Sequence, residues 1–166
     1  ADQPITALEV VVNGQLIAVA QRMPGHVVGD GTHTVEQLVD ITNQDPRRGI
    51  GHEKVLTRLE LDHQAERCLA DLGLDRTSVP PHGVMVALRL TGNPSTGGTA
   101  IDVTDLVHPD NAEMAIRAVK AIGLDVGGVD FISADITASY HDAGGAMCEI
   151  NAAPGFRMHV APSEGK

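Results

Sequence analysis

Two carboxylates and one amide near the C-terminal end of this 166-residue chain have the spacing of a divalent-cation site. Asp130 lies in the run Gly-Val-Asp-Phe-Ile, and the run Glu149-Ile-Asn151 follows it further along the chain. On a strand the side chains at i and i+2 share one face, so a neighbouring strand carrying Asp130 would bring three oxygen ligands together. Mg²⁺ takes such ligands and keeps other positions for water and substrate phosphates. The alternative is that these are solvent-facing strand residues that bind nothing.

Basic residues are scarce, and they gather at one place, where Arg47 and Arg48 are followed by Lys54 and Arg58. The chain has 12 Lys and Arg against 22 Asp and Glu, a net charge of -10. The basic group would attract ATP phosphates or an acidic peptide, and the alternative is a solvated loop. The overall charge argues against a nucleic-acid partner or an anionic membrane, and no apolar run reaches the roughly 20 residues that cross a bilayer.

The remaining reactive side chains have no catalytic or zinc-binding spacing. Cys68 and Cys148 lie far apart and are interpreted as buried small hydrophobic residues of a cytoplasmic protein. The eight histidines are scattered, which argues against zinc. His52 and His159 are interpreted as satisfied surface or core residues, and the alternative is that they contact substrate. No G-x-S-x-G motif is present, so a serine nucleophile has no support.

A sheet must position the carboxylates, and the sequence predicts one. Two β-rich runs flank Asn13-Gly14, which is a strong hairpin signal. Further strands are expected at 84–90 (largely buried), 100–103, 127–133 and 146–151. Helices are expected after the Thr34 capping box, over 62–73, and from Pro109 to just before Gly123. We therefore expect an α+β fold with a mainly antiparallel sheet and helices packed on one side.

Longer motifs resemble a known family. The C-terminal runs Gly-Val-Asp-Phe-Ile and Glu-Ile-Asn-Ala-Ala-Pro-Gly-Phe resemble the metal-binding end of the ATP-grasp ligases. The segments that begin at His26, Asp45, Ser95 and Asn151 narrow the resemblance to the cyanophycin synthetase family. It covers nearly the whole chain, and it implies that residues 1–166 are the C-terminal, metal-bearing lobe of an ATP-grasp domain.

The resemblance implies a ligase that uses ATP and Mg²⁺ to activate a peptide's terminal carboxylate as an acyl phosphate, which the amine of aspartate then attacks. The implied partners are ATP, aspartate, an acidic or polyaspartate primer and the rest of the ligase chain, in a homo-oligomeric full-length enzyme. Phosphoryl transfer needs positioning and charge neutralisation, which metal ions and Arg clamps supply.

Carried over residue by residue, the resemblance gives Asp130, Glu149 and Asn151 the role of Mg²⁺ ligands. Arg89 and Arg157 take catalytic roles. The expected substrate- or phosphate-binding residues are Asn93, Gly97, Gly98, Gly155, Arg22, Arg47 and Arg48. Two of these assignments have plain alternatives: Arg89 as a strand residue paired with an acid, and Asn93 as a turn former before Pro94.

Some of the family's features have no counterpart in these residues. The family's phosphate-contacting lysines and Gly-rich loop have none, and Leu8 stands where the family tends to have an Arg. We therefore expect residues 1–166 to be a fragment that is inactive alone. Two alternatives stay open: another tail-adding ATP-grasp ligase, or a non-catalytic module that binds nucleotide or metal.

Overall fold

The chain forms two compact units, one from residues 1–22 and 100–166 and the other from residues 23–99. The computed structural model describes residues 5–50, 53–160 and 162, without the side chains of residues 5 and 157. The boundaries between the units fall inside two strands rather than in a linker, which is why the sequence does not reveal them.

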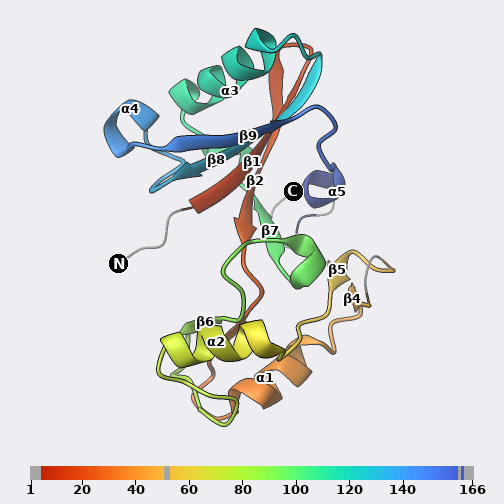
Figure 1. The fold of residues 1–166 in the computed structure, drawn as a ribbon, viewed down its shortest axis with the longest axis vertical. Helices are drawn as coiled ribbons and strands as arrows, with labels where there is room; N and C mark the ends of the chain where they lie inside the picture. The colour runs from red at the N-terminus through yellow and green to blue at the C-terminus, as the bar shows by residue number, and fades with distance from the viewer. Residues whose placement is uncertain (1–4, 51–52, 161, 163–166) are drawn as a thin grey trace. The chain divides into compact units, whose positions relative to one another are not determined.

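The first unit is a five-stranded sheet in the order β7-β2-β1-β8-β9 (Figure 1). The pairs β1–β2, β1–β8 and β8–β9 are antiparallel. The bounds are β1 Ile5–Val12, β2 Gln15–Met23, β7 Thr99–Asp102, β8 Val126–Ser133 and β9 Ala146–Asn151. Its helical segments are η2 Thr104–Leu106, α3 Pro109–Ala121, α4 Tyr140–Ala143 and α5 Arg157–Val160.

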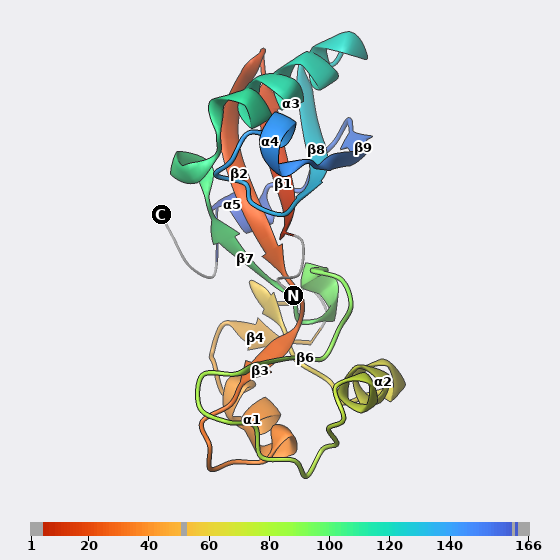
Figure 2. The same cartoon turned by 90° about the vertical axis from the view of Figure 1, so that its left-hand side faces the viewer.

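Helix α3 covers one face of this sheet, and α5 lies against the other face (Figures 1 and 2). Ala115 and Val119 of α3 pack on Val11 and Val129 of the central strands. A second cluster on the same face is formed by Ala7, Val19, Val103, Phe131 and Ile136. The opposite face of the sheet therefore carries the polar side chains that could do chemistry.

The hairpin that begins this unit turns where the sequence predicts it. Asn13 and Gly14 take positive φ values of 49° and 74°, as the turn requires. The register shifts between Val10 and Val11, so the β1–β2 pair contains one irregularity that alternation alone does not show.

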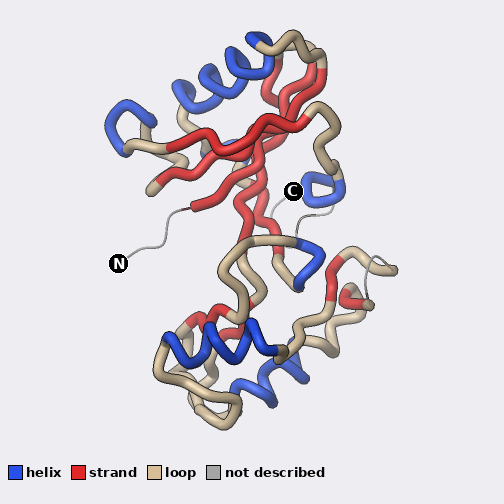
Figure 3. Tube along the Cα trace, in the orientation of Figure 1, coloured by secondary structure: helices blue, strands red, loops and turns tan. Residues whose placement is uncertain are grey.

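The second unit has short strands and two helices around its own core. Its bounds are β3 His26–Val28, α1 Val35–Thr42, β4 Arg48–Gly49, β5 Leu56–Thr57, α2 His63–Asp71, β6 Met85–Ala87 and η1 Pro94–Thr96. The core comprises Val27, Val35, Leu38, Val39, Leu59, Ala65, Leu69, Val86 and Leu88. Strands β3 and β6 pair antiparallel, and β4 and β5 pair parallel. Loops make up much of this unit between its short strands and helices (Figure 3).

Capping explains where the helices of this unit begin. The Thr34 side chain accepts a hydrogen bond from the Gln37 N–H, and the Gln37 side chain accepts one from the Thr34 N–H, so the predicted capping box is formed. Asp62 accepts from the N–H groups of Gln64 and Ala65 at the start of α2. Both side chains satisfy N–H groups that lack a partner inside the helix.

The fold class predicted from the sequence is confirmed: the structure is α+β with a mainly antiparallel sheet. The strand expected over 84–90 is wrong in extent, because its partner β3 has only three residues and pairing covers Met85–Ala87 alone. Leu90 is exposed, so this segment is also less buried than predicted. No helix in the described part of the chain is long and apolar enough to cross a membrane.

Candidate functional site

The register of β8 and β9 brings the three predicted metal ligands to one face. Asp130 lies directly opposite Glu149, and Asn151 lies opposite Gly128, two positions further along β9. Directly opposed residues, and residues two apart on one strand, share a face of the sheet. The two carboxylates and the amide are therefore neighbours on the face opposite α3, as the spacing predicts.

A β-bulge lies beside these residues. Asp130 pairs with Glu149 but Phe131 pairs with Met147, so Cys148 is the extra residue of β9. Such bulges bend a strand and redirect its side chains, often next to functional sites. Cys148 is exposed on this edge strand, so its interpretation as a buried residue is wrong, whereas Cys68 is buried as predicted.

Arg22, on β2, reaches one of these carboxylates, that of Asp130. Its Nη2 donates to Asp130 Oδ1 at 2.7 Å, and both side chains are mostly shielded from solvent. Burial raises the pKa of Asp130, Arg22 lowers it, and the Glu149 carboxylate raises it again. A cation seated between Asp130 and Glu149 would relieve the repulsion between them.

The donor set fits Mg²⁺ by its chemistry. Two carboxylates and one amide oxygen are hard ligands that leave the ion partly charged. Among the residues that the structure describes, no group of three or more His, Cys, Asp or Glu side chains could hold a metal ion, so this candidate set depends on the Asn151 amide as its third donor. The Mg²⁺ ligand roles of Asp130, Glu149 and Asn151 stay a prediction.

Arg89 is bound within its own unit. The buried side chain donates through Nη1 to the carbonyl oxygens of Leu88 at 2.8 Å and Glu60 at 3.3 Å, and through Nη2 to Asp62 at 3.0 Å. The contact with Asp62 matches the alternative of an Arg paired with an acid, although Arg89 lies after the end of β6 and not in a strand. The catalytic role expected for Arg89 stays a prediction.

Asn93 and the two glycines after it build a tight turn. Asn93 Oδ1 accepts from the backbone and side chain of Ser95, which caps η1. Gly97 has a φ of 87°, and a Cβ at Gly98 would lie 2.6 Å from the carbonyl oxygen of Asn93. The turn thus explains these three residues structurally, and their ligand-binding roles stay predictions.

The basic pair divides into two different environments. Arg47 is exposed and makes a bidentate contact with Asp45. Arg48 is buried, donates to the carbonyl oxygen of Thr57 at 2.7 Å, and has its pKa lowered mainly by burial. The solvated-loop alternative therefore describes Arg47 and does not describe Arg48.

Two further expected residues lie after β9. Arg157 begins α5, but its side chain lies outside the described structure. A Cβ added at Gly155 would have no atom within 4 Å, so packing does not require a glycine there. His52 lies outside the described residues altogether.

The sequence did not reveal two buried groups of the first unit. His159 is half-buried, and its Nε2 has no hydrogen-bond partner in the described structure. Glu9 is fully buried, its carboxyl oxygens lack partners there too, and burial raises its pKa to about 8. The position of Glu9 within Ala-Leu-Glu-Val-Val-Val was the available signal, since strand alternation places it with Ala7 and Val11 on the core face.

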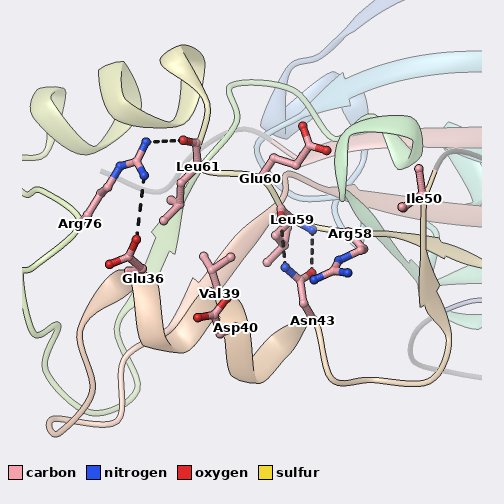
Figure 4. Close-up of a pocket in the computed structure, with 10 residues that line it drawn as sticks. All are labelled: Glu36, Val39, Asp40, Asn43, Ile50, Arg58, Leu59, Glu60, Leu61 and Arg76. Atoms are coloured by element: carbon pink, nitrogen blue, oxygen red, sulfur yellow. Dashed lines mark hydrogen bonds and ion pairs between the residues drawn. The ribbon is translucent and has the colours of Figure 1, made fainter.

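A pocket of about 440 Å³ lies in the second unit beside α1 (Figure 4). Asn43 makes two hydrogen bonds to the backbone of Leu59, and Arg76 donates to the carbonyl oxygen of Leu61. Its lining residues are Glu36, Val39, Asp40, Asn43, Ile50, Arg58, Leu59, Glu60, Leu61 and Arg76. None of the expected catalytic or metal-binding residues lines it.

The structural match identifies the class of fold. No protein-family model matches the chain. Its structure matches the crystal structure of a bifunctional glutathione synthetase from Pasteurella multocida with a TM-score of 0.85 and 34% identity, covering 98% of this chain and 22% of that one. The fold is therefore an ATP-grasp fold, as the sequence motifs predicted.

The relatives found by sequence point to particular ATP-grasp ligases within this class. The chain is 55% identical over 155 residues to a cyanophycin synthetase of Crocosphaera subtropica and 50% identical to one of Synechocystis sp., each over 93% of this chain and 18% of the relative. It is 40% identical to the glutathione biosynthesis bifunctional protein GshAB of Streptococcus agalactiae, over 21% of that protein. The predicted resemblance to cyanophycin synthetase is confirmed, and the chain spans about a fifth of the length of these relatives.

Proposed function

We propose that this chain is the metal-bearing part of an ATP-dependent carboxylate–amine ligase that adds aspartate during cyanophycin synthesis. The observation that carries the proposal is the pairing of Asp130 with Glu149, with Asn151 on the same face. It lies in a segment that is 50–55% identical to cyanophycin synthetases.

In the proposed reaction the terminal carboxylate of an acidic primer attacks the γ-phosphate of ATP and displaces ADP. The amine of aspartate then attacks the acyl carbon of the resulting acyl phosphate and displaces inorganic phosphate. Bound Mg²⁺ would neutralise the phosphate oxygens. Asp130, Glu149 and Asn151 would hold the ion, and Arg22 would keep one oxygen of Asp130 in place.

The remainder of the active site would come from other parts of the protein. The chain spans 18% of its cyanophycin synthetase relatives, so we propose that the ATP-contacting lysines lie outside it, whereas Arg22, Asn93 and Arg157 would contribute to binding of phosphate or primer. On this proposal the two units together form one lobe of the ATP-grasp domain, and residues 1–166 alone do not turn over ATP.

The substitution Glu149→Gln tests this proposal in the full-length gene product. Phosphate release and incorporation of labelled aspartate into an acidic primer should both fall about 100-fold or more, since a catalytic metal contributes several kcal/mol to the transition state. Glu113→Gln is the control, because Glu113 is an exposed acid on α3 and should leave both rates within about two-fold.

Wild-type rates in the Glu149→Gln variant would contradict the metal assignment. An active full-length protein that rejects aspartate would contradict the substrate assignment alone.

A second candidate is a glutathione-forming ligase, which the 40% identity to GshAB favours. Formation of glutathione, rather than an aspartate polymer, by the full-length protein would replace the first proposal with this one. The metal assignment would then stand, because the same β8–β9 pairing would serve either substrate.

A further inference from the structure

His159 lies on the same face of the sheet as the proposed metal ligands. It belongs to α5, which lies beside β2 and β7 on the side opposite α3 (Figures 1 and 2). The imidazole is half-buried, and its Nε2 is shielded from solvent without a hydrogen-bond partner in the described part of the chain. A buried nitrogen without a hydrogen-bond partner costs free energy unless a ligand supplies that partner.

The charges around His159 come from the neighbouring strands. Asp102, on β7, and Arg22, on β2, both act electrostatically on the ring. Asp102 is oriented by Thr104, whose N–H and Oγ1–H both donate to Asp102 Oδ1 at 2.9 and 2.6 Å. Arg22 in turn is paired with Asp130, so His159 adjoins the group that contains the metal ligands.

The surroundings of the imidazole favour its neutral form. Burial is the largest effect and lowers the pKa of His159, Arg22 lowers it further, and Asp102 opposes both. A neutral ring has one nitrogen free to accept a proton.

On the basis of the ligase function proposed above, we propose that His159 accepts the proton that the α-ammonium group of the incoming amino acid must lose before it attacks. The free amine then forms a C–N bond with the acyl carbon, and the C–O bond to phosphate breaks. Inorganic phosphate leaves with the electron pair and takes a second proton from the nitrogen. The third hydrogen remains on the amide, so protons and charge balance.

The other polar groups of this cluster are less suited to that role. Arg22 is permanently protonated and cannot act as a base. Asp130 and Glu149 are assigned to the metal, and Asp102 Oδ1 is already engaged by Thr104. His159 is therefore the group of this cluster with a shielded, unpartnered nitrogen that can accept a proton.

The test compares two nucleophiles in the full-length gene product with the substitution His159→Gln. Hydroxylamine is already uncharged near neutral pH and traps an acyl phosphate as a hydroxamate without a base, whereas aspartate needs deprotonation. We expect hydroxamate formation within about two-fold of wild type, and kcat for aspartate lowered about 100-fold with little change in KM. His141→Gln is the matched control, since His141 is an exposed histidine of the same unit, and it should change neither rate.

Two results with the His159→Gln variant would overturn the inference. Equal losses with hydroxylamine and aspartate would overturn the inference, because they indicate damage to the fold or to phosphoryl transfer. Unchanged aspartate ligation would overturn it as well. A wild-type protein that forms no hydroxamate would overturn the ligase proposal itself, and that failure is distinguishable because it appears before any substitution is made.

Discussion

Glu9 is a carboxyl group in an apolar core. On β1 it lies opposite Val19 on one side and Val129 on the other, and it faces the clusters that pack under α3. Charged α3 residues such as Glu113 and Lys120 are exposed on its outer side, while Asn111, Ala115 and Val119 face inward. Among the described residues no opposite charge is placed to compensate ionisation of Glu9, which explains why burial raises its pKa to about 8.

The stability of the first unit should therefore fall as the pH rises. An unfolded Glu has a pKa near the ordinary 4.5 and the folded one about 8, so folding takes up a proton between these values. Stability is greatest below the unfolded pKa, declines by up to about 1.4 kcal/mol per pH unit through that window, and levels off above the folded pKa.

Glu9→Gln should abolish this decline, because the amide does not ionise. Urea unfolding from about pH 5 to about pH 9 measures it, with Glu113→Gln as the exposed control that should keep the wild-type slope. An identical pH dependence in the Glu9→Gln variant would show that the carboxyl is not buried.

The same substitution, Arg to Met, should lower the free energy of unfolding by different amounts at Arg89 and at Arg47. Arg89→Met removes hydrogen bonds to two carbonyl groups and the contact with Asp62, so the second unit should lose about 1–3 kcal/mol of unfolding free energy. Arg47→Met breaks an exposed pair and should cost less than about 1 kcal/mol. Denaturant unfolding measures both, and equal losses would contradict the assigned contacts.

At the scale of elements, local signals were sufficient where a helix or turn begins. Asn13-Gly14 and the Thr34–Gln37 box each act through neighbouring residues, so a single sequence reveals them. The spacing of Glu149 and Asn151 predicted that these two side chains share a face, whereas the β8–β9 register that puts Asp130 opposite Glu149 is visible only in the structure. The bulge at Cys148 and the burial of Arg48 and His159 depend on distant segments, so the sequence could not show them.

The capping box offers a test at this scale. Thr34→Ala removes the hydroxyl that accepts from the Gln37 N–H, so the second unit should lose about 1 kcal/mol. Thr34→Ser keeps the hydroxyl and should lose much less. Thermal unfolding of the two variants measures the difference, and equal losses would mean that the methyl group rather than the cap stabilises α1.

At the scale of the whole chain, the second unit is inserted between two strands of the first unit's sheet. β2 leads out of the sheet and β7 leads back as its neighbour. The resemblance covered both units at once, so it gave no reason to divide them. Only the contacts within each unit, each with its own core, make the division visible.

The ends of this insertion meet. A Cβ at Gly98 would lie 2.9 Å from the carbonyl oxygen of Met23, so about 75 residues of chain leave and return within one residue's width. Because Met23 and Gly98 lie so close together, a short turn would be enough to connect β2 to β7 directly. The segment between β2 and β7 can therefore differ in length or content without changing the register of the strands that carry Asp130, Glu149 and Asn151.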